Sequence, residues 1–335
     1  MNWLSDEAIS RLREGGSLPD VSGTRYRLVE RIGSGGMGVV YLAEDSVLER
    51  RVALKILDVP DMTGAADALS ERLLREAKIL ARLEHPGIVP VHDSGALADG
   101  RVFYAMKYVE GKRLDQLVEW PPVDGPAGDS LSDRLRIFQR ICDAVGFAHA
   151  RGVLHRDLKP ENIMTGPFGE VLVMDWGIAK ILGSATARGT PPVQQSATES
   201  RMAQSKSTAH GTVLGTRGYM SPEQARGEVE KLDARADIFS LGGILAFLLG
   251  DAQRTPRAVA AIARKAMEAE PSDRYGSVSD LALDVAHYVD GLPVSAYPEN
   301  IFQKAARWAS RYRVAIVLVL TYLVVRGLLI LFLHP

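Results

Sequence analysis

A short stretch of charged and amide side chains, set between apolar segments, constrains this chain more than any other feature. The segment VLHRDLKPENIM covers residues 153–164, and VLVMDWGIAK follows at residues 171–180. Charged groups beside apolar strands are costly unless they are paired or coordinate a metal ion. Carboxylate and amide oxygens are the ligands that Mg²⁺ prefers. Asp175-Trp176-Gly177 therefore poses a question, which is whether this turn binds a metal ion or is a damaged version of one that does.

A glycine-rich segment lies near the amino terminus. Gly33, Gly35 and Gly38, followed by Val39, make a G-x-G-x-x-G pattern. The same spacing opens dinucleotide-binding sites, but those need a helix directly after the glycines. The segment VVYLAE that follows is alternating and β-branched, which is typical of a strand. We therefore expect a hairpin whose backbone N–H groups approach phosphates, and a ligand-free hairpin turn is the alternative.

Two charged residues follow the glycines. Lys55 lies in the apolar strand VALKIL, where an ammonium group needs a partner. Glu76, in the helical segment RLLREAKIL, is a candidate partner. Taken alone, each residue is equally compatible with an ordinary position at the protein surface.

The pattern of apolar residues divides the chain into a strand-rich part and a helical part. Alternating segments at residues 26–57 and again at 88–110 predict strands, with a helix at residues 69–83 between them. After Gly111 the periodicity is mainly helical. We therefore expect an α+β fold of two lobes, the first rich in strands and the second in helices.

Taken together, these motifs resemble the eukaryotic-type Ser/Thr protein kinases, especially the bacterial membrane-anchored members. His155-Arg156-Asp157-Leu158 with Asn162 matches H-R-D-L-x-x-x-N, and TRGYMSPE stands where that family has A-P-E. The resemblance covers about residues 26–290. It implies a small antiparallel β-rich N-lobe (residues 25–110) and a larger α-helical C-lobe (residues 111–292). An activation segment would span residues 175–223, with an insertion at 183–212 whose Ser, Thr and Gln content predicts mobility.

The resemblance assigns roles to individual residues. Lys55 would hold the α- and β-phosphates of ATP and pair with Glu76, and Asp157 would act as catalytic base. Asn162 and Asp175 would hold Mg²⁺, with Mn²⁺ as an alternative, and Lys159 would neutralise the transferring phosphoryl group. The residues implied to contact the nucleotide are Ile32, Gly33, Ser34, Gly35, Gly36, Met37, Gly38, Val39, Val40, Ala53, Lys55, Met106, Lys107, Tyr108, Val109 and Asn162.

Further matches support a complete helical lobe. Glu223 resembles the family's acid that pairs with a late arginine, here Arg274, and Asp237 resembles the buried acid that holds the catalytic loop. The chain departs from the family in two ways: Trp176 replaces the usual Phe or Leu, and the connection after residue 250 is unusually short. The short connection puts the usual mode of substrate docking in doubt.

The activation segment carries candidate modification sites. Arg156 marks the class of kinases that is often switched on by phosphorylation. The resemblance therefore predicts autophosphorylation at one or more of Ser205, Ser207, Thr208 and Thr212. Thr216 resembles the substrate-contacting threonine and is expected to be structural.

The carboxyl end is almost wholly apolar from residue 314 to residue 333. That length is about what a helix needs to cross a bilayer, and basic residues precede it in the linker at residues 293–313. The positive-inside tendency then predicts a single-pass protein of the cell (inner) membrane with a cytoplasmic kinase domain. A buried terminal helix or a partner-binding helix is the alternative.

Residues 1–24 form an extension without the features of a secretion signal.

Composition limits the remaining functions. The formal net charge is -1 and the pI about 6.7, so no basic field favours nucleic acid as a partner. Cys142 is the one cysteine, which excludes an internal disulfide. The leading hypothesis is an ATP-dependent kinase that acts on protein Ser and Thr. A second copy of the kinase domain, forming a homodimer, is a further candidate partner. A pseudokinase and a small-molecule kinase of related fold are the alternatives, and the presence of Lys55, Asp157, Asn162 and Asp175 together favours the active enzyme.

Overall fold

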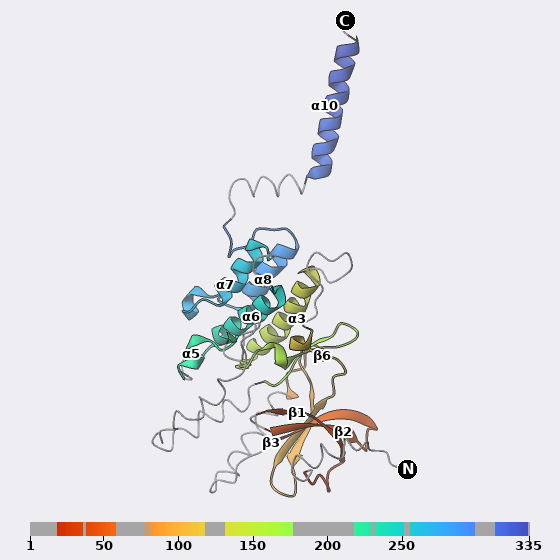
Figure 1. The fold of residues 1–335 in the computed structure, drawn as a ribbon, viewed down its shortest axis with the longest axis vertical. Helices are drawn as coiled ribbons and strands as arrows, with labels where there is room; N and C mark the ends of the chain where they lie inside the picture. The colour runs from red at the N-terminus through yellow and green to blue at the C-terminus, as the bar shows by residue number, and fades with distance from the viewer. Residues whose placement is uncertain are drawn as a thin grey trace, which may run out of the picture.

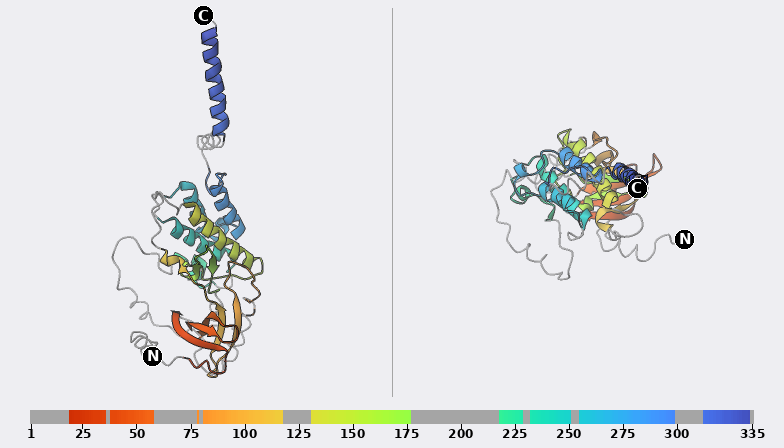
Figure 2. Two further views of the ribbon diagram at one scale, coloured as in Figure 1. Left: turned by 90° about the vertical axis from the view of Figure 1, so that its right-hand side faces the viewer. Right: turned by 90° about the horizontal axis from the view of Figure 1, so that it is seen from above.

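The computed structural model describes residues 19–35, 38–57, 78, 81–117, 131–176, 218–228, 232–250, 255–298 and 312–333. A sheet-rich lobe and a helical lobe lie one above the other, as Figure 1 and the left view of Figure 2 show. This arrangement confirms the predicted two-lobed α+β architecture. The activation-segment insertion, Glu76, Gly36 and Met37 lie outside the described residues.

The N-lobe is a five-stranded antiparallel sheet in the order β1-β2-β3-β5-β4. Its strands are β1 (Tyr26–Gly35), β2 (Gly38–Asp45), β3 (Arg50–Leu57), β4 (Val91–Ala96) and β5 (Val102–Lys107). Strands β1 and β2 face each other up to the pair Gly35 and Gly38, so the glycines do form the end of a hairpin. The predicted hairpin is confirmed. The prediction that a strand and not a helix follows the glycines is confirmed as well.

Side chains alternate between the two faces of this sheet, as they must on a pleated strand. One face is buried within the N-lobe through a cluster that includes Leu54, Ile56 and Phe103. The other face carries Ala53 and Met106, which cluster with Leu172 of the C-lobe. The second face therefore turns toward the other lobe and borders the site between them.

The C-lobe consists of helices and a small three-stranded sheet in the order β6-β7-β8. The strands are β6 (Lys112–Arg113), β7 (Ile163–Thr165) and β8 (Val171–Val173), and the 3₁₀ turns are η1 (Leu114–Gln116), η2 (Pro160–Asn162) and η5 (Pro271–Asp273). The helices are α3 (Leu131–His149), α5 (Pro222–Ala225), α6 (Ala234–Leu249), α7 (Arg257–Ala266), α8 (Val278–Val289) and α10 (Arg313–Leu333).

Helix α6 lies in the middle of the C-lobe core. It packs against α3 and α7, and α3 packs in turn against α8. Most of its side chains are buried, including Ile238, Leu241 and Leu245. A Cβ on Gly242 would lie 2.6 Å from Met267 Cγ, so the close approach of α6 to the end of α7 requires glycine there. Only residues 250–256 connect α6 to α7.

Helix α10 stands apart from both lobes in Figures 1 and 2 and carries exposed apolar side chains such as Val314, Leu318 and Tyr322. Within the part of the chain that the structure describes, no helix combines the length and hydropathy needed to cross a membrane. The membrane span expected at residues 314–333 therefore stays a prediction.

Candidate active site

Lys55 and Asp175 form an ion pair between the lobes. Lys55 lies on β3, Asp175 follows β8, and the distance from Lys55 Nζ to Asp175 Oδ1 is 2.6 Å. The Lys55 side chain is 16% exposed, so its ammonium group is largely removed from water. Burial works against the charged form, but the neighbouring Tyr104 and Asp175 outweigh it and raise the pKa of Lys55. Lys55 is therefore a fixed positive charge in this site.

The strand end that carries Asp175 is held by residues 155–162, which the resemblance assigns as the catalytic loop. The Met174 N–H donates to the Asn162 carbonyl at 2.9 Å, and the Met174 carbonyl lies 2.8 Å from His155 Nε2. Asp175 itself has φ 50, a left-handed conformation that a non-glycine residue adopts at a cost of about 1–3 kcal/mol. The surrounding bonds maintain this conformation and direct the carboxylate to Lys55.

Asp157, Lys159 and Asn162 gather on the catalytic loop. Lys159 Nζ lies 3.1 Å from Asp157 Oδ2. The Asn162 side chain donates from Nδ2 to the Asp157 carbonyl at 2.8 Å and to Asp157 Oδ2 at 3.2 Å. Both bonds use the amide nitrogen, so Oδ1 is the atom of this side chain suited to a metal ion. The structure thus brings together three of the residues that the sequence predicted as functional.

Asp237 on α6 holds the backbone of this loop. Its carboxylate accepts from the His155 N–H and the Arg156 N–H, both at 2.8 Å, and lies 2.7 Å from His149 Nε2. Burial would raise the pKa of Asp237, but the bond with His149 and the other contacts outweigh burial and lower it. The predicted contact of Asp237 with the loop backbone is therefore confirmed.

We expect the Asp237→Asn variant to be less stable than the wild type by about 3 kcal/mol at neutral pH, since a buried N–H would then face an amide nitrogen. A lowered folded-state pKa means that the carboxylate stabilises the protein above its unfolded value of 3.8 and stops doing so as the pH falls through the folded value. The difference in unfolding free energy should therefore shrink on acidification. Urea titrations from neutral pH to about pH 3 measure it, and a difference independent of pH would contradict this account.

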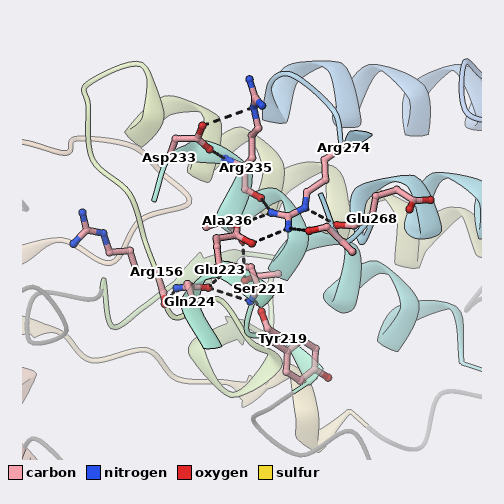
Figure 3. Close-up of polar contacts among 12 residues, drawn as sticks. Arg156, Tyr219, Ser221, Glu223, Gln224, Asp233, Arg235, Ala236, Glu268 and Arg274 are labelled. Atoms are coloured by element: carbon pink, nitrogen blue, oxygen red, sulfur yellow. Dashed lines mark hydrogen bonds and ion pairs between the residues drawn. The ribbon is translucent and has the colours of Figure 1, made fainter. Parts of the chain in front are cut away.

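A second buried pair anchors residues at the end of the predicted activation segment, as Figure 3 shows. Arg274 donates from both terminal nitrogens to Glu223, at 2.7 and 2.8 Å. It also donates to the carbonyls of Arg235, Glu268 and Ala269. The predicted pairing of Glu223 with Arg274 is confirmed.

The residues predicted to contact the nucleotide fall on two faces of the sheet. Ala53 and Met106 are neighbours in the β3–β5 register, and Val40 and Val109 pack with them. Val39 instead packs against the opposite face, within the N-lobe. Val39 and Val40 thus lie on different faces, because consecutive residues of a strand point to opposite sides, and the contact of Val39 with a nucleotide stays a prediction.

The other predicted contacts lie around this face. Ile32, Gly33 and Ser34 belong to β1, with Ile32 42% exposed. Lys107 ends β5, opposite Val52 of β3, and Tyr108 follows it. The contact of these residues with a nucleotide stays a prediction.

Two residues of the site escaped the sequence interpretation. Tyr104 on β5 is buried opposite Lys55 in the strand register, and the centre of its ring lies 5.9 Å from Lys55 Nζ. Burial raises the pKa of Tyr104, so this hydroxyl stays neutral. Gln224 on α5 bonds to the carbonyl of Arg156. The alternation of residues 52–57 against 102–107 could have identified Tyr104, whereas no local pattern indicates Gln224.

Trp176 is 6% exposed and belongs to the core of the C-lobe, with its ring centre 4.7 Å from that of His155. Among the described residues, its Nε1 has no hydrogen-bond acceptor. The tryptophan therefore leaves the Asp175 pair intact and adds a buried N–H that lacks a partner within that part of the chain. The tryptophan therefore changes the packing beside Asp175 and leaves the Asp175 carboxylate in place.

We expect Trp176→Phe to change the free energy of unfolding by less than about 1.5 kcal/mol. Removing a buried N–H without a partner recovers about 1–3 kcal/mol, and the lost ring volume opposes this gain with a similar magnitude. Urea unfolding at neutral pH measures the net change. A loss of unfolding free energy above about 3 kcal/mol would contradict this prediction, because it would show that the indole ring packs better in the core than we infer.

The family comparison agrees with this geometry. The model described as "Protein kinase domain" matches residues 26–275. The chain belongs to the protein kinase family. Serine/threonine-protein kinase PknD of Protochlamydia amoebophila is 33% identical over 323 residues, covering 84% of this chain and 32% of the relative. PknD of Chlamydia trachomatis serovar D is 38% identical over 304 residues, with 80% and 32% coverage. This kinase chain thus spans about a third of the length of these curated relatives.

Solved structures share the kinase fold. The kinase domain of Mycobacterium tuberculosis PknI is 28% identical, with a TM-score of 0.53 over 78% of this chain and 95% of that domain. The structure named "PpkA-294 apo form" reaches a TM-score of 0.60 over 81% of this chain at 20% identity, a likeness in fold alone. The two-lobed kinase architecture is therefore common to all of them.

Proposed function

We propose that this chain is an active protein kinase that transfers the γ-phosphate of ATP to Ser and Thr hydroxyls of proteins. The observation that carries the proposal is the pairing of Lys55 with Asp175 beside the cluster of Asp157, Lys159 and Asn162. Phosphoryl transfer needs little covalent chemistry and much positioning and charge neutralisation. These five residues provide two cations, two carboxylates and an amide in one region.

The oxygen donors of the site fit a magnesium ion. Asp175 Oδ2 and Asn162 Oδ1 are carboxylate and amide oxygens, and the Asp175 side chain is 36% exposed. Within the described residues, no group of three or more His, Cys, Asp and Glu side chains could hold a metal ion by itself. Mg²⁺ is usually held by one or two protein oxygens together with substrate phosphates. When bound, this ion would neutralise charge on the phosphate oxygens, and Mn²⁺ could replace it.

The protein groups then divide the remaining work. Lys55 would hold the α- and β-phosphates of ATP, with the adenine against the apolar face of Ala53 and Met106. Asp157 would orient the acceptor hydroxyl and take its proton, and Lys159 would neutralise the transferring phosphoryl group. Asp237 would keep Asp157 in place through the loop backbone.

The acceptor class is tested with matched peptides. The full chain is incubated with Mg-ATP and three peptides that differ only in carrying Ser, Thr or Tyr. Ser and Thr peptides are expected to accept phosphate at least about tenfold faster than the Tyr peptide. Equal or faster labelling of Tyr would overturn the Ser/Thr assignment, and labelling of a small-molecule hydroxyl in place of any peptide would favour the small-molecule kinase.

A pseudokinase is the second candidate function. It would bind nucleotide or a partner without transferring phosphate, and such proteins commonly lack one of Lys55, Asp157, Asn162 and Asp175. All four are present, and the bonds among them are formed. ATP binding without phosphate transfer by the wild-type chain would favour the pseudokinase.

Autophosphorylation of the activation segment is a further part of the proposal. Ser205, Ser207, Thr208 and Thr212 are the candidate acceptors. Its support is Arg156 beside the catalytic Asp157, since a new phosphate pairs readily with arginine. Mass spectrometry after incubation with Mg-ATP is expected to detect phosphate on this segment in the wild type and not in an Asp157→Asn variant. An unmodified segment in active wild-type protein would remove this part.

We also propose that α10 anchors the kinase in the cell (inner) membrane as a single pass with the kinase domain in the cytoplasm. The support is the apolar sequence from residue 314 to residue 333 and the exposure of its described side chains. Anchoring raises the local concentration and would favour a homodimer of kinase domains. Carbonate extraction of membranes tests the anchor, because release of the chain into the soluble fraction would contradict it. Autophosphorylation rates per kinase that stay equal across dilutions in vesicles would contradict the dimer.

A further inference from the structure

The backbone of Arg156, directly before Asp157, is held in a strained conformation. Its φ is 67, in the left-handed region that favours glycine. Such a residue persists only when its surroundings fix it. On one side the Arg156 N–H donates to Asp237 Oδ1 at 2.8 Å. On the other side the Arg156 carbonyl accepts from Gln224 Nε2 at 2.9 Å. Two side chains from different helices thus fix the peptide units that lead into Asp157.

The orientation of the Gln224 amide is set by its other contacts. Oε1 lies 3.2 Å from the Ser221 backbone nitrogen and 3.1 Å from Ser221 Oγ, both of which can donate. Nε2 must therefore be the atom directed at the Arg156 carbonyl, which can only accept. Gln224 is thus a bridge with a donor end on the catalytic loop and an acceptor end on the start of α5.

The segment that carries Gln224 is firmly attached to the C-lobe. Ser240 on α6 donates from Oγ to the Tyr219 carbonyl at 2.7 Å. Glu223 is held by both terminal nitrogens of Arg274. Figure 3 shows the pair of Glu223 and Arg274 together with the side chain of Gln224 reaching Arg156. The end of the activation segment is therefore a rigid support from which Gln224 reaches the catalytic loop.

We propose that Gln224 is a positioning residue for phosphoryl transfer, and that its amide links residues 219–225 to the backbone that orients Asp157. A shift of the activation segment would then move the Arg156 carbonyl, and with it the carboxylate that receives the acceptor hydroxyl. This inference rests on the proposed kinase activity. It adds a direct bond between residues 219–225 and the loop that carries the proposed base.

The test compares two substitutions of different chemistry. Gln224→Met removes both polar ends at similar length, and Gln224→Glu keeps the acceptor for Ser221 but places an oxygen against the Arg156 carbonyl. Both variants are expected to lower kcat about tenfold, because small displacements of reacting groups cost up to about 10²-fold in rate. The KM for ATP is expected to stay within about twofold of the wild type, since Lys55 and Asp175 are untouched.

Gln224→Met also removes the acceptor for the Ser221 backbone nitrogen at the start of α5. Ser277→Ala is therefore the matched control, because it removes a capping contact at the start of another helix. Ser277 accepts from the Asp280 N–H at the start of α8, in a different part of the C-lobe from α5. Removing this cap should lower the unfolding free energy by about 1 kcal/mol and leave kcat unchanged. A kcat that falls in proportion to stability in all three variants would assign Gln224 a purely structural role.

A pH profile separates positioning from packing. Below its pKa, the carboxyl group introduced by Gln224→Glu carries a proton and can donate to the Arg156 carbonyl as the amide does. The ratio of the variant's kcat to the wild-type kcat is therefore expected to rise as the pH falls from about 8 to about 5.5, with the oxygen neighbour raising that pKa above the ordinary value of about 4.3. The corresponding ratio for Gln224→Met should stay flat.

Two outcomes overturn the inference while the proposed function still stands. One is a wild-type kcat in Gln224→Met, and the other is unchanged hydrogen exchange of residues 153–160 in that variant. Hydrogen exchange needs no activity, so it tests the link even if the wild type transfers no phosphate. Absence of transfer by the wild type would sink the kinase proposal, whereas faster exchange of this loop in Gln224→Met would still support the link.

Discussion

An Asp175→Asn variant is expected to transfer phosphate about 10²–10³-fold more slowly than the wild type while remaining folded. Asp175 Oδ1 lies 2.6 Å from Lys55 Nζ, and we propose that the same carboxylate holds the metal ion. Asparagine keeps the size of the side chain and removes its charge. Losing one preorganised electrostatic contact to the reacting phosphate typically costs about 10²–10³-fold in kcat. The defect should appear at saturating ATP, because it lies in the chemical step.

Asp99→Asn provides the matched control for this prediction. Asp99 also pairs with a cation, with Oδ2 at 2.5 Å from Arg101, but in an exposed turn of the N-lobe. Exposed pairs of this kind contribute little to stability. The control should therefore retain wild-type kcat and an unchanged unfolding midpoint. An Asp175→Asn enzyme within about threefold of the wild type would contradict the role assigned to this carboxylate.

An Arg274→Ala variant is expected to lose about 3–5 kcal/mol of unfolding free energy. The Arg274 side chain is 0% exposed and its partner Glu223 is 6% exposed. Removing one member of such a pair leaves the other charge buried without compensation, which is where the large cost arises. Three backbone carbonyls lose a donor as well. Urea unfolding monitored by circular dichroism measures the difference.

The double variant Arg274→Met with Glu223→Leu separates burial of a charge from loss of packing. Replacing both charges by apolar groups removes the uncompensated carboxylate, so much of the lost stability should return. Its kcat should remain low if the end of the activation segment needs the pair for its position. If Arg274→Ala alone lowered the unfolding free energy by less than about 1 kcal/mol, water would have to screen the pair. That result would contradict the burial that the structure shows.

The sequence predicted the parts of the site that depend on local patterns. The strands follow from alternation, and the loop from His155 to Asn162 follows from a motif without gaps. The pairs of Glu223 with Arg274 and of Asp237 with the loop also agree with prediction, because the order of these residues along the chain matched a known family.

What the sequence could not provide depends on side-chain direction and distant contacts. Val39 and Val40 are neighbours in sequence, yet only the strand register decides which one faces the site. The bond from Lys55 to Asp175 joins residues 120 positions apart, and the bond from Gln224 to Arg156 joins residues 68 apart. Such contacts follow from the packing of two lobes and several helices, which no local pattern encodes.

The central claim is that this chain transfers phosphate with Asp157 as its base, and one measurement addresses it most directly. The full chain and its Asp157→Asn variant are incubated with γ-labelled ATP, with and without Mg²⁺, and label on the chain and on a generic protein substrate is counted. We expect magnesium-dependent labelling by the wild type and a rate lower by about 10²–10⁴-fold in the variant, the usual contribution of a general base. No labelling by the wild type, or equal labelling by the two proteins, would contradict the account.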